Sequence, residues 1–359
     1  MRILALVTDA FGGYGGIAQY NRDFVSALAQ SAAVSEVVVL PRIAGHDIQG
    51  VPEKVRQLGP CSARTAYVAR SVNIVRRDGP FDLIFSGHLY HTPLAAFLGR
   101  WLKVPMWLQT HGIDAWECPA RLVRTASERS DLITTVSRYT KRRLLSWANI
   151  APERVRVLSN TYRPMFTPGP KDPACLARQG IGGGKIILTV SRLAKADHYK
   201  GHTLVIDALP RVLLQHPDAR YVIVGDGDAR EDLEQYVTDR GLSARVHFLG
   251  RCSDGDVLQL YRSSDVYVMP STKEGFGIVF VEAAAAGLSV IGGNRDGSAD
   301  ALADGAIGAM IDPLDQDALV AAVVRGLSST EKSHPDAVRR FAFRNFASHV
   351  DNLVQTLAR

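Results

Sequence analysis

Two glutamates eight residues apart, Glu274 and Glu282, give the sharpest chemical signal in this sequence. Glu274 opens the segment Glu-Gly-Phe-Gly, which precedes a helix expected to begin near Gly277, and Glu282 falls inside that helix. A carboxylate can hold sugar or ribose hydroxyls by accepting two hydrogen bonds. Glycines allow a ligand to approach closely, and the free amides after Gly275 can bind a phosphate. The segment therefore predicts a site for a ligand that carries both hydroxyls and phosphate.

Two cations, Arg192 and Lys200, lie eight residues apart on a loop that follows an expected strand. An arginine and a lysine on one loop can converge on a diphosphate, and positive charge there stabilises the negative charge of a leaving diphosphate. Each cation alone would more often be a solvated surface charge. Both together, at a strand–loop junction facing Glu274, favour a role in the same site.

A glycine-rich loop at residues 9–16 lies between the first expected strand and the first expected helix. Its Gly13-x-Gly15-x-x-Ala18 spacing loosely matches the dinucleotide-binding fingerprint, and Arg42 after the next strand would suit a 2′-phosphate. An NADP-dependent oxidoreductase is therefore one alternative. A tight turn that binds no ligand is another interpretation, because this signal alone is weak.

Three other motifs suggest metal ligands without completing a site. Asp226-Gly-Asp228 and Asp254-Gly-Asp256 are interpreted as a turn and a helix cap, and His88-Leu-Tyr-His91 has no third ligand. No cysteine belongs to a CxxC pair, which argues against a zinc site or a disulfide framework and favours reduced thiols in the cytoplasm. We therefore expect no metal and no cofactor. The cysteines are Cys61, Cys118, Cys175 and Cys252.

The elements that must position these residues alternate between short β-rich apolar runs and helical-period stretches, which predicts βαβ units and parallel sheets. The expected strands are 3–8, 37–40, 83–86, 106–110, 132–136, 155–158, 186–191, 221–224, 246–249, 266–269, 289–291 and 309–311. The expected helices include 17–29, 92–102, 138–148, 203–215, 230–240, 254–262, 279–286 and 316–326.

The segment 163–173 contains four prolines and one glycine and is interpreted as an interdomain linker. We therefore predict an α/β protein of two doubly wound parallel-sheet domains, 1–163 and 164–335. Such sheets bind ligands at the carboxyl ends of their strands, and two edges that face each other would form a central cleft. A chain of 359 residues is long enough for two cores.

The net charge of +6 is unevenly distributed along the chain. Residues 1–163 hold 21 Lys+Arg and 12 Asp+Glu, whereas residues 164–359 hold 21 and 24. The basic first half favours an anionic partner, either an acidic membrane surface or a phosphorylated acceptor. No apolar run reaches the length of a transmembrane segment, and the amino-terminal residues are interpreted as a strand rather than a signal peptide. We expect no nucleic-acid partner.

In order and spacing, the motifs resemble those of the retaining glycosyltransferases of family GT4, which have the GT-B fold with two Rossmann-like domains. One departure is Gly292-Gly293-Asn-Arg-Asp-Gly-Ser298, which stands where the family often carries Gly-Gly-x-Pro-Glu, so the identity of the donor is not inferred from the resemblance. The resemblance covers essentially the whole chain and rests on the glycine loop 12–16, Thr110-His-Gly112, Thr135-Val-Ser137, Asn160, Ser191-Arg-Leu193, Lys200-Gly-His202, Val224-Gly-Asp-Gly227, Phe248-Leu-Gly250, Pro270-Ser271 and the two glutamates.

The resemblance also implies roles for individual residues. Arg192 and Lys200 would bind the donor diphosphate and stabilise it as it leaves. Glu274 would hold hydroxyls of the donor sugar, Glu282 would hold the ribose, and His111 would lie beside the sugar near the reacting carbon. Backbone groups of the donor site would come from Gly15, Gly16, Arg251, Gly277, Ile278 and Val279, with Arg251 beside the base.

The implied activity is metal-independent transfer of a hexose, with retention, from a UDP- or GDP-sugar to a hydroxyl of a glycan or lipid-linked acceptor. The implied setting is polysaccharide or cell-envelope biosynthesis. A carboxy-terminal helix at about 336–359 is expected to cross back onto the first domain. A sugar-nucleotide-binding protein without catalysis is a second alternative to the enzyme.

The expected helix 138–148 is basic and amphipathic. Arg138, Lys141 and Arg142 share one face, and Leu144 and Trp147 lie on another. The helix either packs on the sheet as an ordinary surface helix or contacts anionic lipid. With the charge of the first domain, the second interpretation predicts a cytoplasmic enzyme that is peripheral at the cytoplasmic face of the membrane.

Overall fold

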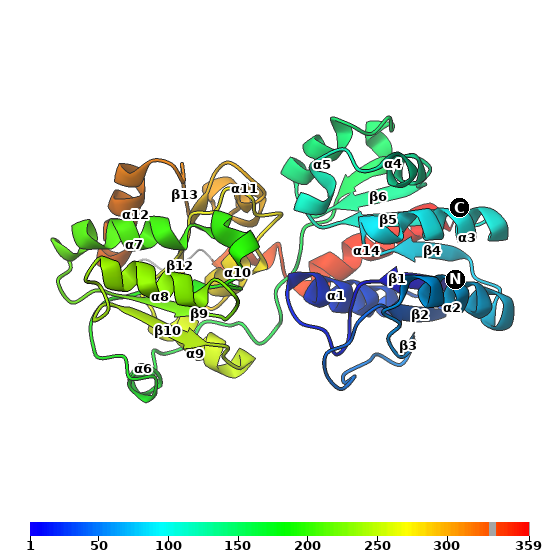
Figure 1. The fold of residues 1–359 in the computed structure, drawn as a ribbon. Helices are drawn as coiled ribbons and strands as arrows, with labels where there is room; N and C mark the ends of the chain where they lie inside the picture. Colours follow the sequence, from blue (N-terminus) through cyan, green and yellow to red (C-terminus); the bar gives the residue numbers. More distant parts are fainter. Residues whose placement is uncertain (330–334, 359) are drawn as a thin grey trace. The chain divides into compact units, whose positions relative to one another are not determined.

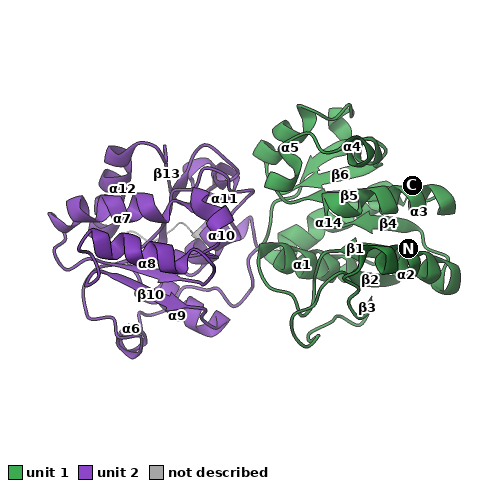
Figure 2. Ribbon diagram, in the orientation of Figure 1, with its two compact units in different colours: residues 1–161, 343–359 green, residues 162–342 purple. Residues whose placement is uncertain are grey.

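The computed structural model describes residues 1–329 and 335–358, which form two compact units (Figure 2). Unit 1 comprises Met1–Thr161 and Phe343–Arg359, and unit 2 comprises Tyr162–Ala342. The boundary thus falls two residues before the one expected from the sequence. The short helix α13 (Pro335–Arg339) belongs to unit 2, and only α14 (Phe343–Leu357) joins unit 1. The last residue of the expected carboxy-terminal helix, 359, lies outside the described residues.

Unit 1 contains a seven-stranded parallel sheet in the order β3-β2-β1-β4-β5-β6-β7 (Figure 1). The strand order reverses at β1, so the carboxyl ends of β1 and β4 lie at the switch point where doubly wound sheets bind ligands. The strands are β1 (Arg2–Val7), β2 (Glu36–Pro41), β3 (Val55–Gln57), β4 (Leu83–Ser86), β5 (Met106–Thr110), β6 (Leu132–Thr135) and β7 (Val155–Val157).

Helices cover both faces of this sheet. The helix α1 (Gly16–Gln30) packs against α14 and supplies Phe24, whose ring centroid lies 4.4 Å from that of Phe85 and 4.9 Å from that of Trp107. Alternate residues of the same strands face the other way, where Ile84 shares a core with residues of α2 and α3. The remaining elements of unit 1 are α2 (Arg64–Asp78), η1 (Leu89–His91), α3 (Thr92–Leu102), η2 (Ile113–Ala115), α4 (Arg121–Glu128), α5 (Arg138–Leu145) and η3 (Pro152–Arg154).

Unit 2 repeats the architecture with six parallel strands in the order β10-β9-β8-β11-β12-β13 (Figure 1). Its switch point lies between β8 and β11. The strands are β8 (Ile186–Val190), β9 (Arg220–Val224), β10 (Val246–Gly250), β11 (Val266–Met269), β12 (Ser289–Gly293) and β13 (Ala309–Ile311). The helices are α6 (Pro173–Arg178), η4 (Lys195–Lys200), α7 (His202–Leu213), α8 (Arg230–Asp239), α9 (Asp254–Ser263), α10 (Ile278–Ala285), α11 (Ser298–Ala301), η5 (Ala303–Gly305) and α12 (Gln316–Ser328).

The two doubly wound parallel sheets confirm the predicted fold class, and the expected strands agree with the observed ones to within two residues at each end. The predicted linker ends where α6 begins, because Pro173 occupies a first-turn position and Asp172 caps the helix by accepting from the amide of Ala174. The elements β3, α2, α6 and α11 were not named among those expected. Each is either very short or rich in arginine, so its apolar period is weak.

The basic helix α5 packs as an ordinary surface helix of unit 1. Leu144 is fully buried, and the indole Nε1 of Trp147 donates to the carbonyl of Ala115 at 2.9 Å. The ammonium of Lys141 donates to the carbonyls of Pro152 and Val155. The apolar side chains that a lipid contact would need therefore point inward. No helix among the described residues is both long and apolar enough to span a bilayer.

The aromatic core beneath α1 gives a direct test of the unit 1 fold. Replacing Phe24, which is fully buried, with alanine should lower the free energy of unfolding by roughly 3–5 kcal/mol. The matched control is Phe97→Ala on α3, where the side chain is 57% exposed and the change should cost less than about 1 kcal/mol. Urea unfolding followed by circular dichroism measures both variants, and equal losses would contradict this packing.

Candidate functional site

The switch point of the unit 2 sheet brings Lys200 and Glu274 together. The strands β8 and β11 are neighbours, Lys200 ends the segment η4 that follows β8, and Glu274 lies on the loop that follows β11. Nζ of Lys200 lies 3.0 Å from Oε2 of Glu274, and the two side chains are 14% and 18% exposed. Residues singled out on two separate loops of the sequence thus form one partly buried ion pair.

Arg192 lies on the same loop as Lys200, and Asp197 holds its guanidinium. Nε donates to Oδ2 of Asp197 at 2.7 Å and Nη2 donates to Oδ1 at 3.1 Å, while the hydroxyl of Tyr199 also donates to Oδ1. Burial alone would raise the pKa of Asp197, but these hydrogen bonds lower it below its ordinary value. Because the side chain of Arg192 is 70% exposed, an ionised carboxylate orients a cation that still faces solvent.

The loop after β11 is held by Asp296, a residue that the sequence did not single out. Oδ2 of Asp296 accepts from the hydroxyl of Ser271 at 2.7 Å and from the amide of Glu274 at 2.6 Å, and Oδ1 accepts from the amide of Ser298. Burial raises the pKa of Asp296, and these same donors oppose that shift. The sequence offered one signal that could have identified Asp296: an aspartate beside a glycine in the loop that follows a strand. Asp296 fixes the backbone from which Glu274 projects.

The helix α10 begins directly after this loop, with Gly277 as its N-cap. Gly277 has φ +86°, and a Cβ there would lie 2.5 Å from the ring of Phe280, so another residue would be strained as well as crowded. No side chain caps the helix, and the amides of Ile278 and Val279 stand in its first turn. Uncapped amides at a helix N-terminus form an anion-binding position.

Glu282 lies within α10 and is almost fully buried, with 5% exposure. Its Oε1 lies 3.5 Å from Nη2 of Arg163, whose Nη1 also bonds to Asp254 in the first turn of α9. An arginine of the same unit therefore lies against Glu282. Arg251 is exposed and directly follows β10, at the edge of the sheet where the other site residues stand.

In unit 1, the glycine loop ends at the N-terminus of α1. Gly15 is the N-cap with φ +87°, and no side chain caps the helix. No atom lies within 4 Å of the position that a Cβ would take at Gly15, and both Gly15 and Gly16 are exposed. The loop therefore presents an open helix N-terminus at the carboxyl end of β1, as the sequence predicted.

His111 follows β5 at the same edge of the unit 1 sheet. Its Nε2 lies 2.8 Å from the carbonyl of Gly87, and its backbone amide donates to Oδ1 of Asp114 at 3.0 Å. A carbonyl only accepts, so Nε2 carries the proton and Nδ1 carries the lone pair. Burial lowers the pKa of His111 to about 3, and neighbouring His88 adds to the shift. The imidazole is therefore neutral near pH 7.

Two further polar side chains, His88 and Asp114, lie beside His111, and His91 lies near His88. Nδ1 of His88 accepts from the amide of Tyr90, and its Nε2 lies 3.9 Å from Oδ2 of Asp114. Burial lowers the pKa of His88 to about 4 and that of His91 to about 3, and it raises the pKa of Asp114 to about 7. The pair His88 and His91, which the sequence left as a weak metal motif, thus belongs to a buried polar cluster with His111 and Asp114.

The other two metal-like motifs make local structural contacts. Oδ1 of Asp228 accepts from the amide of Lys195. Ser253, rather than Asp254, caps α9 by accepting from the amide of Asp256. In the part of the chain that the structure describes, no group of three or more His, Cys, Asp or Glu side chains is placed to hold a metal ion.

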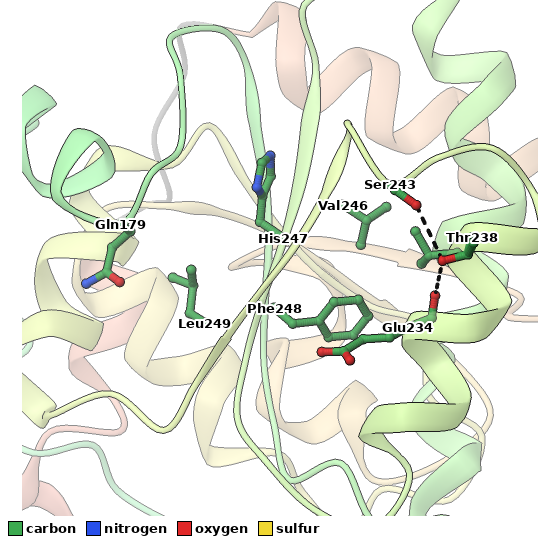
Figure 3. Close-up of a pocket in the computed structure, with 9 residues that line it drawn as sticks. Gln179, Glu234, Thr238, Ser243, Val246, His247, Phe248 and Leu249 are labelled. Carbon is green, nitrogen blue, oxygen red and sulfur yellow. Dashed lines mark hydrogen bonds between the residues drawn. The ribbon is translucent and has the colours of Figure 1, made fainter.

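A shallow surface groove on unit 2 lies beside β10, the edge strand of the sheet (Figure 3). Its lining includes His247 and Phe248 of β10, and Thr238 of α8, whose hydroxyl donates to the carbonyl of Glu234. None of the expected site residues lines this groove. It therefore carries no part of the proposed chemistry.

Family models match both halves of the chain. Residues 177–338 match "Glycosyl transferases group 1", and residues 14–164 match "Glycosyltransferase Family 4". Together the two matches span most of the sequence, and each falls largely within one of the two units.

Individual relatives agree with these models. The chain is 28% identical over 357 residues to the GDP-mannose-dependent alpha-(1-6)-phosphatidylinositol monomannoside mannosyltransferase of Mycobacterium tuberculosis, covering 92% of this chain and 90% of that protein. It is 30% identical over 226 residues to the enzyme of the same description from Mycolicibacterium smegmatis, covering 60% of this chain and 58% of that protein. Among solved structures, HepE from Anabaena in complex with UDP superposes with a TM-score of 0.79 at 22% identity, covering 99% of this chain and 100% of that chain.

The buried histidines predict an acid-sensitive fold. His88, His91 and His111 stay neutral when folded but gain a proton near pH 6.5 when unfolded, so their contribution to stability falls as the pH drops from about 6.5 toward about 4. Asp114 acts in the opposite direction, because its raised pKa favours the folded state increasingly as the pH falls from about 7 toward about 4. Burial also raises the pKa of Asp9 in unit 1, which acts in the same direction as Asp114. Three histidines still outnumber two aspartates, so acid should destabilise unit 1.

The measurement is the midpoint of thermal unfolding between about pH 7.5 and about pH 4.5. The midpoint should fall toward acid, and Asp114→Asn should steepen that fall by removing one of the opposing groups. A midpoint that rises toward acid in both proteins would contradict the buried, neutral state of the histidines.

Proposed function

We propose that this chain, which belongs to the family 4 glycosyltransferases of the group 1 type, transfers a hexose from a nucleoside-diphosphate sugar to an acceptor hydroxyl with retention at the anomeric carbon. The observation that carries the proposal is the Lys200–Glu274 ion pair at the switch point of the unit 2 sheet. Beside it stand the oriented guanidinium of Arg192 and the uncapped N-terminus of α10. One loop cluster therefore offers positive charge for a diphosphate and a carboxylate for hydroxyls.

The diphosphate would be bound by Lys200 and Arg192. Lys200 is largely shielded from water, and charge acts more strongly in such a place than in bulk solvent. Asp197 fixes the guanidinium before the ligand arrives, which reduces the reorganisation needed as charge develops on the leaving diphosphate. The amides of Ile278 and Val279 would add the positive end of the α10 dipole.

Glu274 would hold hydroxyls of the transferred sugar. Lys200 pairs with Oε2, and a carboxylate has further lone pairs on both oxygens to accept from hydroxyl groups. Glu282 would hold the ribose and Arg251 would border the base. For Glu282 this requires the Arg163 side chain to shift or to share the carboxylate, because the two lie 3.5 Å apart.

The chemical step would proceed on one face of the sugar. The bond from the anomeric carbon to the diphosphate oxygen breaks, and the bond to the acceptor oxygen forms on the same face. The acceptor proton passes to an oxygen of the leaving diphosphate, so no protein nucleophile is needed. Lys200 already pairs with Glu274 in the structure, which supports a hydroxyl-holding role for this carboxylate rather than attack on the sugar.

The acceptor would be held by unit 1. Its carboxyl edge carries the open glycine loop at Gly15 and Gly16 and the neutral imidazole of His111. Tyr90 is 75% exposed at this edge and stacks with His88 at 4.5 Å between ring centroids, a surface that suits a sugar ring. The mycobacterial relatives are named for phosphatidylinositol monomannoside acceptors, which supports a lipid-linked glycan acceptor.

An NADP-dependent oxidoreductase built on the first glycine loop would leave the unit 2 ion pair without a role. The two family matches assign both halves of the chain to glycosyltransferases instead. A protein that binds the sugar nucleotide without catalysis would have the same residues, and only an activity measurement separates it from an enzyme.

The function is tested by incubating the purified chain with GDP-mannose, UDP-glucose and other nucleotide sugars and measuring release of the nucleoside diphosphate with and without a membrane-lipid extract as acceptor. One donor should be consumed in an acceptor-dependent manner. Because two cations are proposed to balance the diphosphate charge, turnover should persist in EDTA. Binding of a donor without turnover would favour the non-catalytic alternative, and loss of activity in EDTA that Mg²⁺ restores would show that a metal supplies the charge.

Binding of the donor diphosphate by Lys200 and Arg192 predicts a large loss of turnover when either cation is removed. Lys200→Ala and Arg192→Ala should each lower kcat by roughly 10²-fold or more, because each removes charge that stabilises the leaving group. Lys195→Ala is the matched control, since Lys195 belongs to the same segment η4 but pairs with Asp232 and is 58% exposed. Its activity should be within about twofold of the parent protein. Equal activity in all three variants would remove both cations from the site.

A further inference from the structure

The outer surface of unit 1 carries exposed aromatic and aliphatic side chains on two adjacent helices. Phe97 and Trp101 stand one turn apart on α3 and are 57% and 42% exposed, with their ring centroids 6.1 Å apart. Leu122 on the neighbouring helix α4 is 71% exposed. Large apolar side chains grouped on one surface mark an interaction site more often than apolar residues scattered singly over a surface do.

These apolar side chains lie within a strongly basic layer. The helices α2, α3 and α4, with the C-cap residues Lys103 and Arg129, contain nine Lys or Arg and only two Asp or Glu. The guanidinium of Arg76 on α2 lies 5.7 Å from the ring centroid of Trp101, which ties α2 to the aromatic pair. Arg100, Lys103 and Arg129 line one groove between α3 and the start of β6, together with Asp131.

Most of this positive charge is not used within the protein. Of the basic residues named above, none forms an ion pair in the described ranges 1–329 and 335–358, whereas Arg124 on the same layer is bound to Glu128. Both acidic residues of the layer are themselves paired with arginines, Asp78 with Arg56 and Glu128 with Arg124. The unpaired cations therefore leave a net positive surface around an apolar centre.

We propose that this surface, defined by Phe97, Trp101, Leu122 and the surrounding cations and called the α2–α4 face, docks the enzyme on an anionic lipid bilayer. The proposal rests on the proposed function, in which the acceptor is lipid-linked. Aromatic rings with a polar or cationic neighbour are suited to the boundary between headgroups and acyl chains, and basic residues around them are attracted to anionic headgroups. The charge of the face complements such a bilayer. The helix α5 does not compete for this role, because Leu144 is buried and Trp147, just beyond the helix, is tied to the carbonyl of Ala115.

The test is sedimentation of the full chain with vesicles of phosphatidylcholine alone and of phosphatidylcholine mixed with phosphatidylglycerol, at low and high salt. The parent protein should bind the anionic vesicles at low salt and be released at high salt, because exposed charges are screened. Phe97→Ser/Trp101→Ser and Arg100→Glu/Lys103→Glu should each lower the partition coefficient by roughly tenfold or more.

Two matched controls test whether vesicle binding depends on this face rather than on net charge or on any exposed apolar side chain. Arg142→Glu/Arg143→Glu on α5 makes the same change in net charge in the same unit, and Leu214→Ser removes an 82% exposed side chain of unit 2. Both should bind vesicles within about twofold of the parent protein. Absent binding at low salt, or an equal loss in the α5 variant, would overturn the proposal. A concentration-dependent dimer that Phe97→Ser/Trp101→Ser converts to monomer would assign the face to self-association instead.

Catalysis is followed separately as hydrolysis or transfer of the donor in the absence of vesicles. The Phe97→Ser/Trp101→Ser variant should keep this activity and its thermal unfolding midpoint while losing vesicle binding. If the parent protein uses no donor at all, the proposed function fails, but the vesicle experiment still decides whether the α2–α4 face binds lipid.

Discussion

The buried carboxylate of Asp296 is the constraint on which the proposed donor site depends. It accepts from the hydroxyl of Ser271, the amide of Glu274 and the amide of Ser298, so one side chain joins the loop after β11 to the loop after β12. The amide of Gly297 returns a hydrogen bond to the carbonyl of Glu274. With its backbone held on both sides, Glu274 can meet Lys200 at 3.0 Å without ordering a flexible loop.

The sheet topology explains why these loops meet at all. Parallel strands deliver all their carboxyl ends to one edge, and the reversal of strand order makes β8 and β11 neighbours although more than seventy residues separate them in sequence. Close backbone approach at this edge requires glycine: a Cβ at Gly297 would lie 2.0 Å from the carbonyl oxygen of Gly275. The same logic operates in unit 1, where β1 and β4 bring the glycine loop and the polar cluster around His111 to one edge.

The sequence predicted those features that follow from local pattern. Apolar runs located most strands, and the glycines after Glu274 placed the start of α10 near Gly277, one residue before Ile278, where the helix begins. It did not predict the partners of buried polar groups, because these depend on contacts between distant segments. Asp296 was seen only as part of an unusual loop, and the contact of Arg163 with Glu282 was not foreseen. The roles of the site residues themselves remain predictions that kinetics must test.

The charge of the first half of the chain also shows that local pattern does not predict contacts between distant segments. Counting residues showed an excess of cations, and helical periodicity pointed to α5, since its cations and apolar residues lie on different faces. Periodicity cannot tell whether an apolar face points to the core or to solvent, and in α5 Leu144 and Trp147 point to the core. On α3, by contrast, the rings of Phe97 and Trp101 are exposed, one turn apart, with Arg100 between them in sequence. Unit 1 therefore presents two distinct surfaces: a carboxyl edge with neutral imidazoles, and a helical layer in which Arg76, Arg100, Lys103 and Arg129 form no ion pair with a described residue.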